Sequence, residues 1–159
     1  MIGDWLTGDR KGREPSLRER ALRFLARREH SRAELARKLA PHADESGAID
    51  SVLDDLESRG WLSERRVVEQ VVHARRTRFG ARRIERELLD KGVSEDGVAA
   101  ALPQLKEGEL EAARAVWLKK FGGRQPGRPA ERARQVRFLQ GRGFDLDVIL
   151  KVIKGGDKE

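Results

Sequence analysis

The chain has 159 residues, which is enough for one domain or a short array of small units. With 34 basic and 27 acidic side chains it carries a net charge of +7, which favours nucleic acid or another acidic partner. The lack of cysteine excludes disulfides, thiolate metal sites and cysteine nucleophiles. No apolar run is long enough for a membrane span or a signal peptide, so we expect a cytoplasmic protein with no membrane partner.

Alanine, leucine, arginine and glutamate dominate the composition and strand-type runs are absent, so the sequence predicts an all-α fold. Residues 1–15 show no helical period and are expected to form a flexible N-terminal arm. The rest divides into three segments, 16–62, 63–105 and 106–159, each with the pattern of three helices. In chain order the predicted helices are about 16–29, 31–40, 48–60, 63–78, 81–91, 94–102, 107–121, 129–143 and 144–154.

Capping signals and helix breakers set most of these boundaries. Ser16 and Ser31 are each followed three residues later by glutamate, which is the pattern of a capping box at a helix start. Gly60 stands where a C-terminal glycine cap is expected. Pro103 lacks a backbone N–H and is predicted to end the sixth helix at Leu102.

The three segments resemble one another. Leu39, Leu88 and Leu139 occupy the same place in the middle helix of each segment and recur about every 50 residues. Periods of this size are typical of helical arrays in which neighbouring units share a core, so the sequence predicts an elongated, curved array of three tandem three-helix repeats. Chance similarity between amphipathic helices is the alternative, and it leaves the all-α prediction unchanged.

Positive charge is unevenly distributed along the chain. The four stretches 1–30, 31–62, 63–105 and 106–159 carry net charges of +3, −3, +2 and +5. Two concentrations of basic residues stand out, one at 75–86 around Phe79-Gly80 and one at 114–142, where Glu131 is the only acidic residue. They predict surfaces for a phosphate backbone or an acidic protein groove, the alternative being ordinary solvated helix faces.

Signals for catalysis or metal binding are weak. The glycine-rich stretch 122–127 lacks the Gly-Lys-Ser/Thr ending of a phosphate-binding P-loop. His30, His42 and His73 have no ligand-pair spacing and are expected at the surface or at helix ends. The acidic group Asp54, Asp55, Glu57 and Glu64 is better explained as an interaction face than as a catalytic pair. We therefore expect no catalytic residue, no metal and no cofactor.

The run from Arg75 through Phe79-Gly80 to Val93 resembles the central signature of the RecX regulatory proteins. Residues 21–39, with Ser31, Glu34 and Leu35, and the ending 137–144 are similar to that family's flanking signatures. The similarity covers about residues 16–154, in the right order. Ser63 and Val67 depart from it, because the family often has aspartate and usually an aromatic residue at these two positions.

The resemblance implies a non-enzymatic negative modulator of the RecA recombinase, with roles in DNA recombination, DNA repair and the SOS response. Its implied partners are RecA, the RecA filament and single-stranded DNA, with double-stranded DNA as a further candidate, and it would act as a monomer. Binding in the filament groove or at the growing end would inhibit ATP hydrolysis, strand exchange and co-protease activity. Ten basic residues are our candidates for binding DNA or the filament: Arg75, Arg76, Arg78, Arg82, Arg83, Lys119, Lys120, Arg124, Arg132 and Arg137.

A second class of function remains open from the residues themselves. The segment 16–62 has the size of a three-helix DNA-reading module, so a sequence-specific DNA-binding regulator is the alternative. Such a protein would prefer one duplex over another, whereas a filament modulator would act through RecA.

Overall fold

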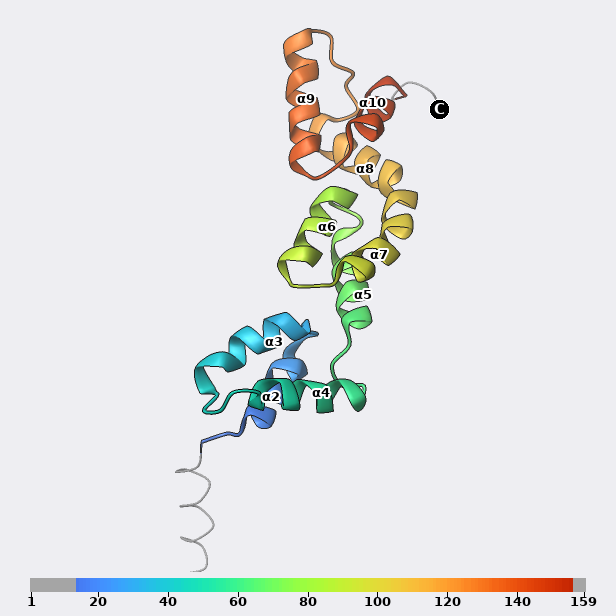
Figure 1. Cartoon of the computed structure of the whole chain (residues 1–159). Coiled ribbons are helices and arrows are strands. Elements are labelled where there is room, and N and C mark those ends of the chain that lie inside the picture. The colour runs from blue at the N-terminus through green and yellow to red at the C-terminus, as the bar shows by residue number, and fades with distance from the viewer. Residues whose placement is uncertain (1–13, 156–159) are drawn as a thin grey trace, which may run out of the picture. The chain divides into compact units, whose positions relative to one another are not determined.

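The computed structural model describes residues 14–155, and every regular element in this range is a helix (Figure 1). The all-α prediction is therefore confirmed for these residues. Most of the expected N-terminal arm, residues 1–13, lies outside them. The chain divides into two compact units, Met1–Ser63 (unit 1) and Glu64–Glu159 (unit 2).

In residues 14–63, unit 1 forms three α-helices, and the first two begin at side-chain caps. The Ser16 hydroxyl accepts from the backbone N–H of Glu19 at 3.1 Å, and Ser31 forms a full capping box with Glu34, as the sequence predicts. Its core is built of apolar side chains that are almost fully buried: Ala21, Leu35, Leu39, Leu53, Leu56 and Leu62. The elements are α2 (Leu17–Arg27), α3 (Arg32–Leu39), a 3₁₀ turn (Ala40–His42) and α4 (Ala48–Ser58).

Unit 2 contains six helices around two cores. The first core includes Val67, Ile84 and Leu88, and the second is built around Trp117, Phe144 and Ile149. Val67 is 2% exposed, so a valine fills this core position. Two sets of three helices surround these cores: α5 (Glu64–Arg75), α6 (Ala81–Asp90) and α7 (Glu95–Glu107), then α8 (Glu109–Phe121), α9 (Pro129–Gly141) and α10 (Leu146–Lys154).

The prediction that Pro103 ends its helix is wrong. Helix α7 continues through Pro103 to Glu107, and Leu105 beyond the proline is 5% exposed and belongs to the first core of unit 2. A proline in a helix interior costs about 3 kcal/mol, while burying a leucine contributes about 1.5–3 kcal/mol. Burial of Leu105 therefore offsets much of the proline's effect.

His30 lies at a helix end, as the sequence analysis expects, but it is buried, with 2% of its surface exposed. Its ring packs against Phe24, with centroids 5.8 Å apart. Nδ1 donates to the carbonyl of Arg28 at 3.0 Å, and Nε2 lies 2.9 Å from the Lys38 ammonium, which must donate to it. The imidazole is therefore neutral in this arrangement, and burial, with Arg28 and Lys38 nearby, lowers its pKa.

The start of α6 is held by the second three-helix set. Gly80 N–H donates to the carbonyl of Arg142 at 2.8 Å, Ala81 N–H to the carboxylate of Glu109 at 2.7 Å, and Arg82 N–H to the carbonyl of Gly143 at 3.2 Å. A Cβ on Gly80 would lie 2.3 Å from the Gly143 oxygen, so the two backbones touch. These bonds satisfy N–H groups that the first turn of a helix leaves free, and they join the two sets.

Candidate functional site

Four guanidinium groups surround the ring of Phe79, at the junction just described. Arg83 lies 4.3 Å from the ring centroid, Arg142 5.2 Å, Arg78 5.8 Å and Arg75 5.9 Å. All four distances fall within the range of cation–π attraction. We call these five residues the Phe79 cluster. Arg142 reaches it from the far end of α9 because the Gly80–Arg142 bond brings the two chain segments together.

Most of the positive charge of the Phe79 cluster is not neutralised. Arg75 pairs with Glu87 at 3.1 Å. Among the described residues Arg78, Arg83 and Arg142 form no ion pair with a carboxylate. Like charges held this close repel one another, so a bound anion would stabilise the arrangement.

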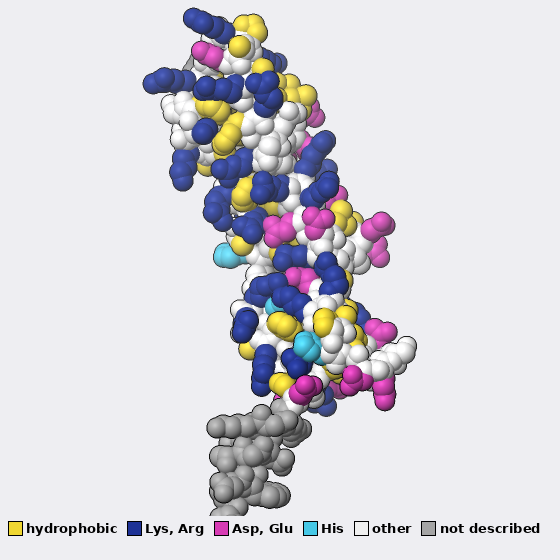
Figure 2. All heavy atoms as spheres, turned by 90° about the vertical axis from the view of Figure 1, so that its left-hand side faces the viewer, with side chains coloured by type: hydrophobic (Ala, Val, Ile, Leu, Met, Phe, Trp, Pro, Cys, Tyr) yellow, Lys and Arg dark blue, Asp and Glu magenta, His cyan; other side chains and the backbone are white. Residues whose placement is uncertain are grey.

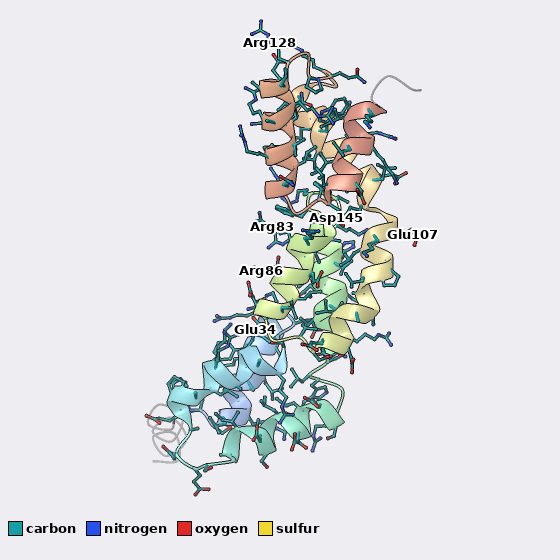
Figure 3. The ribbon with its side chains drawn as sticks, turned by 45° about the horizontal axis from the view of Figure 1, so that its top comes forward. Glu34, Arg83, Arg86, Glu107, Arg128 and Asp145 are labelled. Carbon is teal, nitrogen blue, oxygen red and sulfur yellow. The ribbon has the colours of Figure 1, made fainter. Side chains whose placement is uncertain are left out.

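The basic surface extends from the cluster along α6 and α9. Figure 2 shows the face of unit 2 that carries these two helices, with dark blue side chains spread over α9 and the adjoining end of α6. Arg83 and Arg86 project from one side of α6, whereas Glu107 projects from the end of α7 on the other side (Figure 3). Arg128 lies at the opposite end of α9 from the Phe79 cluster (Figure 3).

The structure separates the ten predicted binding residues into two groups. Arg75 and Arg82 have carboxylate partners, Glu87 at 3.1 Å and Asp145 at 2.5 Å. The other eight form no ion pair with any described carboxylate, and all eight are exposed: Arg76, Arg78, Arg83, Lys119, Lys120, Arg124, Arg132 and Arg137. The contacts bring Arg75, Arg78 and Arg83 together at Phe79, whereas Lys120 and Arg124 line a separate pocket in the second set.

Two arginines with ring contacts on this surface, Arg142 and Arg134, are not among the ten predicted residues. Arg142 belongs to the Phe79 cluster, and Arg134 lies over the Phe121 ring at 5.8 Å and lines the same pocket as Lys120. Both stand in the basic stretch 114–142, so the charge signal was present. Their positions depend on tertiary contacts that no local pattern shows.

The acidic residues of unit 1 are bound to arginines of the same unit. Arg32 contacts Asp54 at 2.8 Å and Glu57 at 3.0 Å, and Asp55 pairs with Arg59 and Arg18. The bond from Arg59, followed by that from Arg18, lowers the pKa of Asp55. Three residues of the predicted acidic interaction face, Asp54, Asp55 and Glu57, thus form ion pairs with arginines of unit 1.

Glu64, the last member of that acidic group, also has an internal role. Its carboxylate accepts from the backbone N–H of Ser94 at 2.7 Å and from the Ser94 hydroxyl at 2.9 Å. Glu64, the first residue of α5, therefore holds the N-terminal end of α7 in place.

Glu109 is a buried carboxylate, 3% exposed, at the start of α8. Burial raises its pKa, while the bond from Ala81 N–H and the nearby Arg82 oppose that shift. Its contact with the α6 N-terminus makes it part of the support for the Phe79 cluster.

Residues 14–155 contain neither a metal-binding cluster nor a membrane-spanning helix. No three histidine, aspartate or glutamate side chains there gather closely enough to hold a metal ion. None of the helices described is both long and apolar enough to cross a membrane.

Comparison with known proteins matches the whole helical part of the chain. Models of the first, second and third three-helix domains of RecX match residues 18–56, 63–102 and 107–153. Regulatory protein RecX of Leptothrix cholodnii is 54% identical over 144 residues, and that of Ralstonia nicotianae 47% over 146 residues, each match covering 91% of both chains. A crystal structure of RecX from Lactobacillus salivarius has a TM-score of 0.76 at 18% identity, over 89% of this chain and 94% of that chain.

The fold and the surface together define an all-helical protein of three tandem three-helix domains with an exposed arginine cluster. Its close relatives are regulatory proteins. The chain belongs to the RecX family, and the resemblance carried by residues 75–93 is confirmed.

Proposed function

We propose that this protein is a non-enzymatic negative modulator of the RecA recombinase. It binds the RecA filament on single-stranded DNA, in the groove, at the growing end, or both, and lowers ATP hydrolysis, strand exchange and co-protease activity. It acts as a cytoplasmic monomer in DNA recombination and repair. Membership of the RecX family supports the regulatory role.

The observation that carries the proposal is the Phe79 cluster. Three of its guanidinium groups have no carboxylate partner among the described residues, and the backbone bonds of Gly80 and Arg82 hold the cluster in place. Planar guanidinium groups bind phosphates through paired hydrogen bonds. A fixed group of them suits a phosphate backbone that is held in a filament.

The arginines of α9 support the same proposal. Arg132 and Arg137 are exposed and have no ion pair with a described residue. Neutralising phosphates with such cations releases counterions, which makes binding depend strongly on salt. The basic surface therefore predicts affinity for DNA or a DNA filament that falls as salt rises.

The test is the DNA-dependent ATP hydrolysis of RecA on single-stranded DNA, with this protein added at far less than one copy per RecA monomer. We expect inhibition, because one molecule on a filament affects many subunits. Replacing Arg78, Arg83 and Arg137 together by glutamine should weaken binding and reduce the slope of log affinity against log salt by about 2, at roughly 0.7 per phosphate contact on a single strand.

Arg65→Gln is the control for removing an exposed arginine charge elsewhere on unit 2. Arg65 is an exposed arginine of unit 2 that already pairs with Glu69 at 3.1 Å, so its loss should leave inhibition unchanged. Absence of inhibition together with tight binding to one particular duplex would refute the proposal in favour of a sequence-specific DNA-binding regulator.

A further inference from the structure

A second basic site lies under the loop that joins α8 to α9. It is a cavity of about 430 Å³, within the range of small-molecule sites. Its charged lining consists of Lys120 at the end of α8, Arg124 in the loop, and Glu131 and Arg134 in the first turns of α9. It lies in the second helical set and shares no lining residue with the Phe79 cluster, although Lys120 and Arg142 both lie over the Phe138 ring, at 5.1 and 5.4 Å from its centroid.

The three cations of this pocket are not neutralised by described carboxylates. Lys120 lies 5.1 Å from the Phe138 ring centroid, and Arg134 lies 5.8 Å from that of Phe121, but no ion pair holds either charge. Glu131 accepts from the backbone N–H of Gly127 at 3.1 Å. Three cations and one carboxylate leave the lining with a charge of +2.

Hydrogen bonds to buried groups hold the shape of the pocket. Gln135, 5% exposed, lies in its wall, accepts from the Trp117 indole at 2.9 Å and donates to the carbonyl of Arg124 at 3.0 Å. Gln125 donates to the carbonyl of Ile153 at 3.2 Å, which ties the loop to α10. These bonds tie the loop backbone to α9 and α10 on either side of the pocket.

We propose that this pocket binds a phosphate monoester, such as the 5′-phosphate of a nucleotide. A phosphate monoester carries nearly two negative charges at pH 7, because its second pKa is about 6. That charge matches the +2 lining, whereas a phosphodiester carries only one negative charge. The ligand is either a free nucleotide or the phosphorylated 5′ end of a DNA strand, since both present the same group.

The test is calorimetric titration of the full chain with deoxyadenosine 5′-monophosphate, without RecA or DNA. We expect saturable binding to one site, and no binding of the uncharged nucleoside deoxyadenosine. Lys120→Gln, Arg124→Gln and Arg134→Gln should each raise Kd about tenfold. The matched controls Lys151→Gln and Arg65→Gln remove the same charge from exposed residues outside the pocket, and should change Kd less than twofold.

The pH dependence tests the preference for a dianion. Binding of the monophosphate should weaken as pH falls from 7.5 to 5.5, because the ligand loses its second charge. A dithymidine phosphodiester, titrated in parallel, reports any change in the charged lining residues Lys120, Arg124, Glu131 and Arg134. If the affinities for the monophosphate and for the diester change with pH by the same factor between pH 7.5 and 5.5, the proposal is contradicted.

A third measurement distinguishes the two sources of the ligand. If the natural ligand is a strand end, a 5′-phosphorylated decathymidylate should displace the monophosphate better than its 5′-hydroxyl form. The Arg134→Gln variant should abolish this difference between the two strands. If it is a free nucleotide, the two strands should compete equally while the monophosphate still binds. Failure of the monophosphate to bind, or equal losses in Lys151→Gln and Lys120→Gln, overturns the inference and leaves the RecA proposal untouched.

Discussion

The two units use the same residue type in different ways. In unit 1, Arg18, Arg32 and Arg59 hold carboxylates of their own unit, with Arg32 alone contacting Asp50, Asp54 and Glu57. In unit 2 the four arginines around Phe79 contact its aromatic ring, and all of them except Arg75 have no described carboxylate partner. The paired arginines of unit 1 thus serve the fold, whereas Arg78, Arg83 and Arg142 of unit 2 are left available for an anionic partner.

The difference has a physical consequence for the folded state. Exposed ion pairs contribute little, typically below about 1 kcal/mol each, but a network around one guanidinium adds several such terms. Unpaired like charges oppose folding instead. Unit 2 must therefore rely on its two cores and on the backbone contacts between Gly80 and Gly143.

The largest effect is expected at Gly143. Its φ of +90° is unfavourable for other residues, and an added Cβ would lie 2.6 Å from the backbone nitrogen of Arg83. Gly143→Ala should therefore destabilise unit 2 by about 3 kcal/mol or more. Urea unfolding followed by Trp117 fluorescence, with the other two tryptophans replaced by phenylalanine, measures this.

Gly47 provides the control in unit 1. Its φ is +85°, but an added Cβ would meet nothing within 4 Å. Gly47→Ala should cost only the left-handed backbone penalty, roughly 1–2 kcal/mol. Equal losses at Gly47 and Gly143 would show that the backbone contact between the two helical sets contributes nothing.

Unit 1 should lose stability in acid because of His30. Burial lowers the pKa of its imidazole, so the folded state favours the neutral ring and unfolding takes up a proton. This contribution is complete above about pH 6.5 and is lost as pH falls toward the lower folded value. Each unit by which the pKa falls corresponds to about 1.4 kcal/mol.

The measurement is NMR titration of the His30 ring together with the urea midpoint of unit 1 between pH 7.5 and 5. Lys38→Met removes a cation 2.9 Å from Nε2 and should raise the pKa of His30. A His30 pKa at or above the ordinary histidine value would contradict this prediction.

Unit 2 should show the opposite dependence through Glu109. Burial raises the pKa of this carboxyl group, so its contribution to stability is complete below the ordinary glutamate pKa of 4.5 and is lost as pH rises through the pKa of the folded state. Glu109→Gln keeps an oxygen for the Ala81 N–H and should remove this dependence. The free energy of unfolding is measured from pH 4 to 7 for the original protein and for Glu109→Gln. If it changes with pH in the same way in both, Glu109 is not the cause of the pH dependence.

The smallest expected changes in stability compare a paired arginine with an unpaired one. Arg32→Ala leaves three carboxylates near one another and should destabilise unit 1 by about 1 kcal/mol. Arg137→Ala, at an exposed and unpaired position of α9, should change stability by less than about 0.5 kcal/mol in either direction. Thermal unfolding of the two variants gives both values, and a larger loss at Arg137 would reverse the comparison.

Much of the fold could be predicted because its signals are local. The capping residues Ser16 and Ser31, and the apolar spacing that buries Leu39, Leu88 and Leu139, act within one or two helical turns. Pro103 was misjudged for the opposite reason, since the burial of Leu105 that offsets it depends on helices distant in sequence.

The candidate site was predicted only as charge. The basic stretches 75–86 and 114–142 are visible in the sequence, but which of their cations remain unpaired depends on tertiary neighbours. Arg82 meets Asp145, 63 residues away, and Arg75 meets Glu87 on the next helix. Counting charges along the sequence cannot show that Arg75 and Arg82 are paired whereas Arg83 is not.

The sequence by itself determined that the chain is helical, repeated, basic and a member of the RecX family, because composition, period and signature motifs are properties of the chain alone. Only the tertiary structure decided where the unpaired charge gathers. Arg142 joins Phe79 because Gly80 and Gly143, which lack a Cβ, allow two backbones to touch. Pairing and repulsion between charges depend on distance in space, which the order of residues does not give.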